Sequence, residues 1–190
     1  MEDLISIVIT TYKRSDKIEE AIKSAISQTY RNIEIIVVDD NAKAQDERNK
    51  TEKIVEKYKN VIYIQNKENL GGALSRNVGI KNAKGKFIAF LDDDDKYTKD
   101  KIEKQYQCYE QHKNDKVGLI YCYCYRENQK GNIVGNYKND YEGNRIYEQM
   151  LGCIARDIFM VLSKRCVNIC WNVWRYTMQT RFNNVAKIIM

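Results

Sequence analysis

The sequence predicts an α/β fold with a mostly parallel central sheet flanked by helices. Short β-branched segments alternate with longer segments of helical period, which is the pattern of strands joined by crossover helices. The 190 residues are enough for one domain with its own core. Hydrophobic residues make up 43% and charged residues 31%, which is typical of a globular protein.

The first half of the predicted domain reads as strand, helix, strand. Residues 5–9 are a β-branched segment that we expect to be buried on both faces. Ser15 is a predicted N-cap, because apolar residues recur at helical spacing from Ile18 to Ile26. Residues 33–38 predict the second strand, which ends at consecutive aspartates.

The second half repeats the alternation. A charged segment with Ile54 and Val55 predicts a helix, and residues 61–64 predict the third strand. A turn at Gly71 precedes a predicted helix over residues 73–82, and residues 87–91 predict the fourth strand. Four strands that alternate with three helices indicate a parallel sheet with right-handed crossovers.

The remainder of the chain has a weaker pattern. We expect a helix over Lys101–Gln111, a strand over residues 119–125 and a turn over residues 130–132. Residues 152–190 follow neither period.

Composition excludes some classes of protein. Lys and Arg outnumber Asp and Glu by 32 to 26, but the signs are interleaved, which argues against nucleic-acid binding. The basic end after Glu148 is interpreted as solvated, with peripheral contact to an anionic membrane as the alternative. The six cysteines form no CxxC pair and follow no signal peptide, so we expect a cytoplasmic protein. No window of about 20 apolar residues predicts a transmembrane helix.

Three polar clusters follow predicted strands: residues 10–14, Asp39 with Asp40, and residues 92–95. Because ligands of open α/β sheets bind beyond the carboxyl ends of the strands, we expect these clusters to converge on one rim. Four consecutive aspartates repel one another unless a cation lies among them, and Mg²⁺ or Mn²⁺ prefers carboxylate oxygens and bridges to diphosphates. The alternative is a solvated acidic loop before the next helix.

The other clusters supply complementary groups. Tyr12 offers an aromatic face for a base, and Lys13 with Arg14 offers positive charge for phosphates. A carboxylate at Asp40 can accept a hydrogen bond from a base or a ribose hydroxyl, although an ordinary turn is the alternative. Arg76 lies one helical turn after the Gly71-Gly72 pair, in reach of a phosphate. Neither a P-loop nor a G-x-G-x-x-G fingerprint is present.

Five segments, in order, resemble the motifs of family 2 glycosyltransferases: VITTYKR at residues 8–14, QTY at 28–30, IIVVDDN at 35–41, NLGGALSRNVGI at 69–80 and FLDDDD at 90–95. The resemblance extends over about residues 5–110, weakens to about residue 165 and ends there. It implies a GT-A fold, a UDP-sugar or similar donor, a divalent metal (Mg²⁺ or Mn²⁺), and transfer to an acceptor hydroxyl with inversion at the anomeric carbon.

By motif match, the resemblance assigns Thr10, Tyr12 and Asp40 to the base, Asp92 and Asp93 to the ribose and diphosphate, and Asp94 to the metal as the last carboxylate of the DxD element. The residues expected to bind the nucleotide sugar are Thr10, Tyr12, Arg14, Asp40, Arg76, Asp92 and Asp93, and those expected to bind the metal are Asp94 and Asp92.

The resemblance lacks one expected feature, a paired acidic motif for the general base. After Glu127 the acids are isolated, at Asp140, Glu142, Glu148 and Asp157, so the catalytic residue is not assigned. We expect residues 1–165 to form the nucleotide-sugar-binding domain and residues 166–190 an atypical basic tail, with the acceptor half missing or degenerate.

Three functions are compatible with these features. The first is a glycosyltransferase, acting in cell surface polysaccharide biosynthesis on a glycan or lipid-linked acceptor, in the cytoplasm or peripherally at the inner face of the membrane. The second is a catalytically impaired nucleotide-sugar-binding module that lacks the general base. The third is a sugar nucleotidyltransferase, which would need a glycine-rich phosphate loop that residues 10–14 do not provide.

Overall fold

The computed structural model describes residues 2–112, 119–120, 122, 124–128, 130–137 and 161–163. The chain divides into two compact units, Met1–Lys104 and Gln105–Met190. The predicted boundary near residue 165 falls outside the described residues and stays a prediction.

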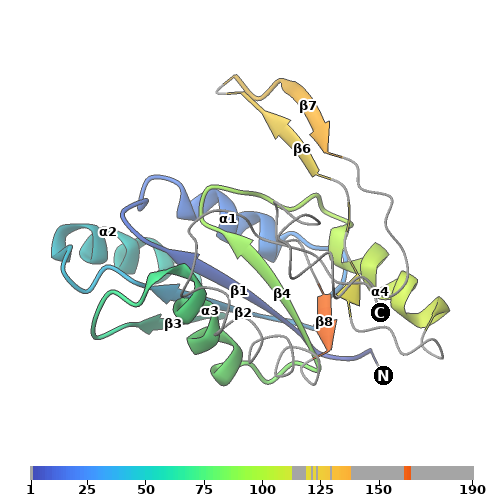
Figure 1. Cartoon of the computed structure of the whole chain (residues 1–190), viewed down its shortest axis with the longest axis horizontal. Helices are drawn as coiled ribbons and strands as arrows, with labels where there is room; N and C mark the ends of the chain where they lie inside the picture. The colour runs from blue at the N-terminus through green and yellow to red at the C-terminus, as the bar shows by residue number, and fades with distance from the viewer. Residues whose placement is uncertain are drawn as a thin grey trace, which may run out of the picture. The chain divides into compact units, whose positions relative to one another are not determined.

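The first unit is a four-stranded parallel sheet with strand order β3-β2-β1-β4 (Figure 1). Its elements in chain order are β1 (Ile5–Thr11), α1 (Ile18–Ile26), β2 (Ile33–Asp39), α2 (Gln45–Val55), β3 (Val61–Gln65), α3 (Gly71–Asn82) and β4 (Phe87–Asp92). The predicted alternation of strands and helices is therefore confirmed. Because the chain runs from β1 outward to β3 and then returns to β4, right-handed crossovers place α1 and α2 on one face and α3 on the other.

The core lies on both faces of the central strands. Six of the seven β1 residues are buried apolar or hydroxyl side chains with almost no exposure, and β4 is buried over Phe87 to Leu91. The edge strand β3 is only half-buried, as expected for a strand with one neighbour. Helix α1 buries Ile18, Ala21, Ile22 and Ala25, which is the apolar stripe that its helical spacing predicted.

Helix α3 packs very closely on β1 at Gly79. A Cβ added to this glycine would lie 2.3 Å from Cγ1 of Val8 and 3.0 Å from its Cγ2. Such a distance is far inside van der Waals contact, so this position needs glycine for packing. The close approach places the first turns of α3 beside the carboxyl end of β1.

Two local predictions are wrong. Ser15 does not cap α1: the N-cap is Lys17, and the Ser15 hydroxyl donates to Oε2 of Glu47 in α2 at 2.8 Å. Helix α3 begins at Gly71 rather than at residue 73, with Gly71 at φ 76°. In both cases the hydrogen-bond partner lies in a distant segment of the chain. Glu47 accepts from the Ser15 hydroxyl, and Asp40 accepts from the Gly71 N–H.

The second unit contains short strands. Helix α4 (Lys101–Gln111) crosses the boundary between the units. Strand β5 (Leu119–Ile120) pairs antiparallel with β8 (Val161–Ser163), and β6 (Cys124–Glu127) pairs antiparallel with β7 (Ile133–Tyr137). The single strand predicted over residues 119–125 is therefore wrong, because its two ends belong to different strand pairs.

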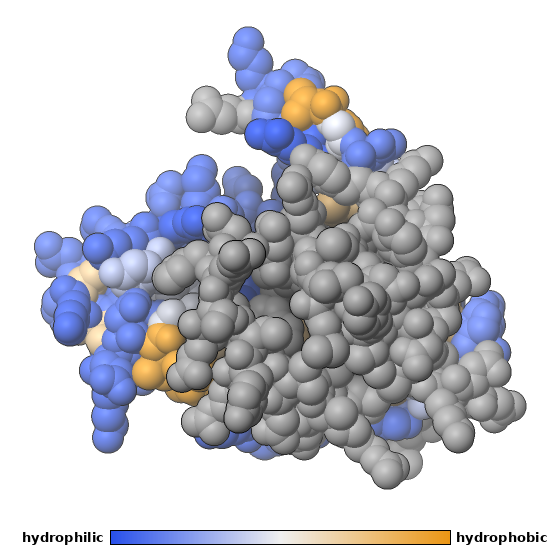
Figure 2. All heavy atoms as spheres, in the orientation of Figure 1, coloured by the Kyte–Doolittle hydropathy of each residue, from blue (hydrophilic) through white to orange (hydrophobic). Residues whose placement is uncertain are grey.

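The β6–β7 hairpin closes through the predicted turn. Gly131 has φ 77°, and Oδ1 of Asn128 accepts hydrogen bonds from the backbone N–H groups of Lys130 and Asn132 at 2.9 and 3.0 Å. The hairpin carries apolar side chains at its surface, of which Ile133 is 63% exposed, among the mainly hydrophilic described surface (Figure 2). Of the described helices, none is long and apolar enough to cross a membrane.

Candidate functional site

The strand register brings the polar clusters to the same rim of the sheet. Thr10 of β1 lies beside Asp92 of β4, and Thr11 lies beside Asp39 of β2. Parallel strands end at one edge, so residues that follow β1, β2 and β4 meet there.

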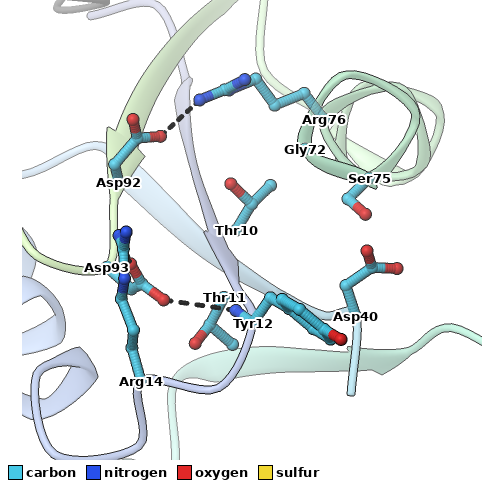
Figure 3. A pocket seen from close by; sticks show the side chains of 10 residues that line it. All are labelled: Thr10, Thr11, Tyr12, Arg14, Asp40, Gly72, Ser75, Arg76, Asp92 and Asp93. Carbon is cyan, nitrogen blue, oxygen red and sulfur yellow. Dashed lines mark hydrogen bonds and ion pairs between the residues drawn. The ribbon is translucent and has the colours of Figure 1, made fainter. Parts of the chain in front are cut away.

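A pocket of about 220 Å³ opens at this rim (Figure 3). It is lined by Thr10, Thr11, Tyr12, Arg14, Asp40, Gly72, Ser75, Arg76, Asp92 and Asp93. All seven residues predicted to bind the nucleotide sugar line it, whereas Asp94, predicted to bind the metal, is not among the lining residues. The structure thus brings the predicted set together, and the roles of its members remain predictions.

The loop between β1 and α1 is held by groups from other strands. The backbone N–H of Tyr12 donates to Oδ2 of Asp93 at 3.3 Å, and that of Lys13 donates to Oδ1 of Asn41 at 2.7 Å. The Tyr12 ring is 43% exposed and extends toward Asp40 across the pocket (Figure 3). A flat aromatic face is therefore open to a ligand.

Two arginines neutralise the aspartate run. Nη1 of Arg14 lies 3.0 Å from Oδ1 of Asp93 and 2.8 Å from Oδ2 of Asp94. Nη2 of Arg76, a mostly buried side chain of α3, lies 2.5 Å from Oδ1 of Asp92 (Figure 3). Burial raises the pKa of the Asp93 carboxyl, and the neighbouring Thr11 and Arg14 side chains only partly offset that effect.

Asp40 is almost fully buried, and both of its carboxylate oxygens are already in use. Oδ1 accepts from Asn66 Nδ2 at 2.8 Å and from the Leu70 N–H at 2.9 Å. Oδ2 accepts from Asn69 Nδ2 at 2.9 Å and from the Gly71 N–H at 2.8 Å. Asp40 therefore fixes the start of α3, which carries Ser75 and Arg76 into the pocket.

Asp39 lies behind the pocket and is fully buried. Its carboxylate accepts the Tyr63 hydroxyl at 2.5 Å and the Asn41 N–H at 2.6 Å, and Nη2 of Arg48 lies 3.7 Å away. Burial, with the hydrogen bond to Asp39, raises the pKa of the Tyr63 hydroxyl. This polar cluster stiffens the end of β2 beneath Asp40.

The carboxylates fit a divalent cation that also binds a diphosphate. Among the described residues, no group of three or more acidic, histidine or cysteine side chains forms a cage for a metal ion. Mg²⁺ commonly uses only one or two protein carboxylates and takes its other ligands from phosphates and water. Asp92 and Asp94 are each nearly half exposed, so both are accessible to a cation, which would have to share them with the guanidinium that each already holds.

Three lining residues, Thr11, Gly72 and Ser75, are not among those expected to bind the nucleotide sugar, although all lie in the segments that carried the predicted motifs. Ser75 is fully buried and its Oγ accepts from Asn66 Nδ2 at 3.0 Å. The four acids after Glu127 that were considered for a general base fall outside the described residues.

The sequence of the chain is similar to those of known glycosyltransferases. Residues 6–165 match the model of the family described as Glycosyl transferase family 2. An uncharacterized glycosyltransferase of Rickettsia conorii is 37% identical over 147 residues, which are 77% of this chain and 23% of that protein. The Escherichia coli UDP-Glc:alpha-D-GlcNAc-diphosphoundecaprenol beta-1,3-glucosyltransferase WfaP is 43% identical over 105 residues, which are 54% of this chain and 40% of WfaP.

A solved structure shares the fold. S. aureus TarS 1-349 in complex with UDP-GlcNAc superposes with a TM-score of 0.67 at 22% identity, over 87% of this chain and 47% of TarS 1-349. The chain spans about a quarter of the length of the Rickettsia relative and less than half of WfaP and TarS 1-349.

Proposed function

The chain belongs to glycosyl transferase family 2 and has the GT-A fold, and on this premise we propose that it transfers a sugar from a nucleotide-diphosphate donor, a UDP-sugar or a similar one, to an acceptor hydroxyl. The observation that carries the proposal is the pocket at the carboxyl rim of the sheet. Residues from the ends of β1, β2 and β4 and from the first turns of α3 line it together.

The base end of the donor fits the side of the pocket formed by Thr10, Tyr12 and Asp40. The exposed Tyr12 ring can stack on a base, and the Thr10 hydroxyl can donate or accept a hydrogen bond. Asp40 already accepts four hydrogen bonds, so a base N–H would replace one of them, such as that from the Asn69 side chain.

The diphosphate end fits the side formed by Arg14, Arg76 and the aspartates. A divalent cation, Mg²⁺ or Mn²⁺, held by Asp94 and Asp92 would neutralise charge on the departing diphosphate. Arg14 and Arg76 each carry a guanidinium that can donate to phosphate oxygens. Asp93, buried and hydrogen-bonded to the Tyr12 N–H, keeps this side aligned with the base end.

Transfer with inversion requires the acceptor oxygen to attack the anomeric carbon from the face opposite the leaving diphosphate. The new bond joins that oxygen to the anomeric carbon, the bond to the diphosphate oxygen breaks, and a base takes the acceptor proton. Asp140, Glu142, Glu148 and Asp157 are the acids available after Glu127 to take that proton.

The proposed acceptor is supported by family membership and by a relative. WfaP is named for a diphosphoundecaprenol-linked acceptor, which supports a glycan or lipid-linked acceptor in cell surface polysaccharide biosynthesis. With such an acceptor, the chain would act at the cytoplasmic face of a membrane. The basic end after Glu148 would favour an anionic surface there.

Calorimetric titration of UDP into the full chain tests the proposal, with Mn²⁺, with EDTA and with Asp94→Ala. Binding that needs Mn²⁺ and is lost in Asp94→Ala supports it. Asp46→Ala is the matched control, because Asp46 is an exposed carboxylate on α2 outside the pocket. The absence of UDP binding under every condition would contradict the proposal.

Turnover is measured separately, as UDP released from UDP-glucose and from UDP-GlcNAc by the same preparations. Release that depends on Mn²⁺ supports a transferase. Metal-dependent UDP binding without release from either donor would instead support the catalytically impaired binding module.

A further inference from the structure

Lys13 adopts a left-handed backbone conformation with φ 55°. In the described part of the chain it is the one non-glycine residue with positive φ. For a residue with a Cβ this conformation is about 5- to 30-fold less populated than the right-handed one, so the neighbouring structure must hold it.

Asn41 is the side chain that holds it. Its Oδ1 accepts the Lys13 N–H at 2.7 Å, and Asn41 is fully buried. Asn41 is itself fixed, because its own N–H donates to the buried carboxylate of Asp39, which also accepts the Tyr63 hydroxyl. The amide oxygen that accepts the Lys13 N–H is therefore held at the rigid end of β2.

The residues on either side of Lys13 both line the pocket. The Tyr12 N–H bonds to Asp93, and the Tyr12 ring is exposed toward the ligand space. Arg14 turns back toward Asp93 (Figure 3) and pairs with both Asp93 and Asp94. A change of φ at residue 13 would reorient the chain between these two side chains and separate the aromatic face from the guanidinium.

We propose that Asn41 is a positioning residue for nucleotide binding: it locks Lys13 in the left-handed turn that presents Tyr12 and Arg14 to the donor together. This inference rests on the proposed function, because it assumes that Tyr12 and Arg14 contact a nucleotide. Asn41 itself does not line the pocket. Asn41 would affect the affinity for UDP through the fraction of unliganded molecules in which the turn is already formed.

A general loss of stability has to be separated from this role. Asn41 is buried, so Asn41→Ala would weaken the fold even without a positioning role. Gln28 offers a matched control: it is an equally buried amide that bonds to Ser24, Thr98 and Ile102 and does not line the pocket. Gln28→Ala is expected to lower the urea midpoint and leave UDP affinity unchanged.

The test measures UDP affinity in the presence of Mn²⁺, with Asn41→Ala introduced into the wild type, into Lys13→Ala and into Lys13→Gly. Lys13→Gly allows positive φ freely, whereas Lys13→Ala also removes the lysine side chain but keeps the free-energy cost of positive φ. We expect Asn41→Ala to weaken binding about tenfold in the wild type and in Lys13→Ala. In Lys13→Gly we expect about twofold or less, because the turn no longer needs Asn41.

An equal loss of affinity in the Lys13→Ala and Lys13→Gly backgrounds would overturn the proposal. If the wild type fails to bind UDP, the proposed function fails. The effect of Asn41→Ala in the same backgrounds is then measured as the free energy of unfolding in urea. Asn41→Ala should then destabilise the Lys13→Ala chain less than the Lys13→Gly chain, because loss of Asn41 lets the alanine backbone leave its unfavourable conformation. Equal destabilisation in both backgrounds would show that Asn41 does not hold the turn.

Discussion

The guanidinium of Arg14 lies 2.8 Å from a carboxylate oxygen of Asp94, and the same nitrogen lies 3.0 Å from Asp93. The predicted metal ligand thus has a positively charged partner within the chain. Because a guanidinium and a divalent cation attract the same oxygens, Arg14 is expected to compete with the metal.

Arg14→Gln should therefore raise the affinity for Mn²⁺ alone by about two- to fivefold, the equivalent of one half-exposed ion pair. Lys13→Gln is the control, because it removes a neighbouring charge that lies over the Tyr12 ring rather than on a carboxylate. Electron paramagnetic resonance of free Mn²⁺ measures both affinities. An unchanged or weaker affinity in Arg14→Gln would contradict the competition.

Asp40→Asn should lower the free energy of unfolding by about 2–4 kcal/mol, because buried donors from Asn66, Leu70, Asn69 and Gly71 would lose a charged acceptor. Urea unfolding measures the change. The exposed control Asp46→Asn should stay within about 0.5 kcal/mol of the wild type. Equal stability of the two variants would show that Asp40 does not anchor α3.

Gly79→Ala should destabilise the chain by about 1–3 kcal/mol, since the new Cβ would meet the Val8 side chain. The cost should be smaller in a Val8→Ala background, where both γ-methyl groups are gone. Thermal unfolding of the four chains measures this. Gly135→Ala is the matched control, because a Cβ there meets nothing within 4 Å. If Val8→Ala did not reduce the cost of Gly79→Ala, the steric contact of the new Cβ would lie with a residue other than Val8.

Glu47 gives a pH dependence of known sign. Hydrogen bonds from Lys50, and then from Ser15, lower the pKa of its carboxyl to about 2 from an ordinary 4.5. A depressed pKa stabilises the fold above the unfolded value, and this contribution is lost as the pH falls from 4.5 toward 2.

The urea midpoint of the wild type should therefore fall more steeply than that of Glu47→Gln over this interval. Glu56→Gln, at an exposed site on the first unit, provides the control and should follow the wild type. Parallel profiles for the wild type and Glu47→Gln would refute the assignment.

Much of the fold was predictable because parallel strands and their crossovers leave periodic signals. The convergence of Thr10, Asp40 and Asp92 followed from the rule that strand ends share one rim. It required no knowledge of side-chain contacts.

The failures share a physical cause, which is a partner that lies far away in the sequence. Ser15 matches the pattern of an N-cap, yet its hydroxyl bonds to Glu47 in the next helix. The left-handed Lys13 is unfavourable by itself and persists through Asn41, 28 residues later. The local propensity of a segment gives no information about such long-range partners.

The hydrogen bonds that Asp40 accepts from the N–H groups of Leu70 and Gly71 also determine the electrostatics of α3. A free helix N-terminus carries a partial positive charge that often binds phosphate, but here a buried carboxylate already compensates the helix dipole. An incoming diphosphate would meet a neutralised helix end. On the proposed function, attraction for the anion would therefore come from the arginine side chains and the proposed cation, and affinity should decline with ionic strength as expected for discrete charges.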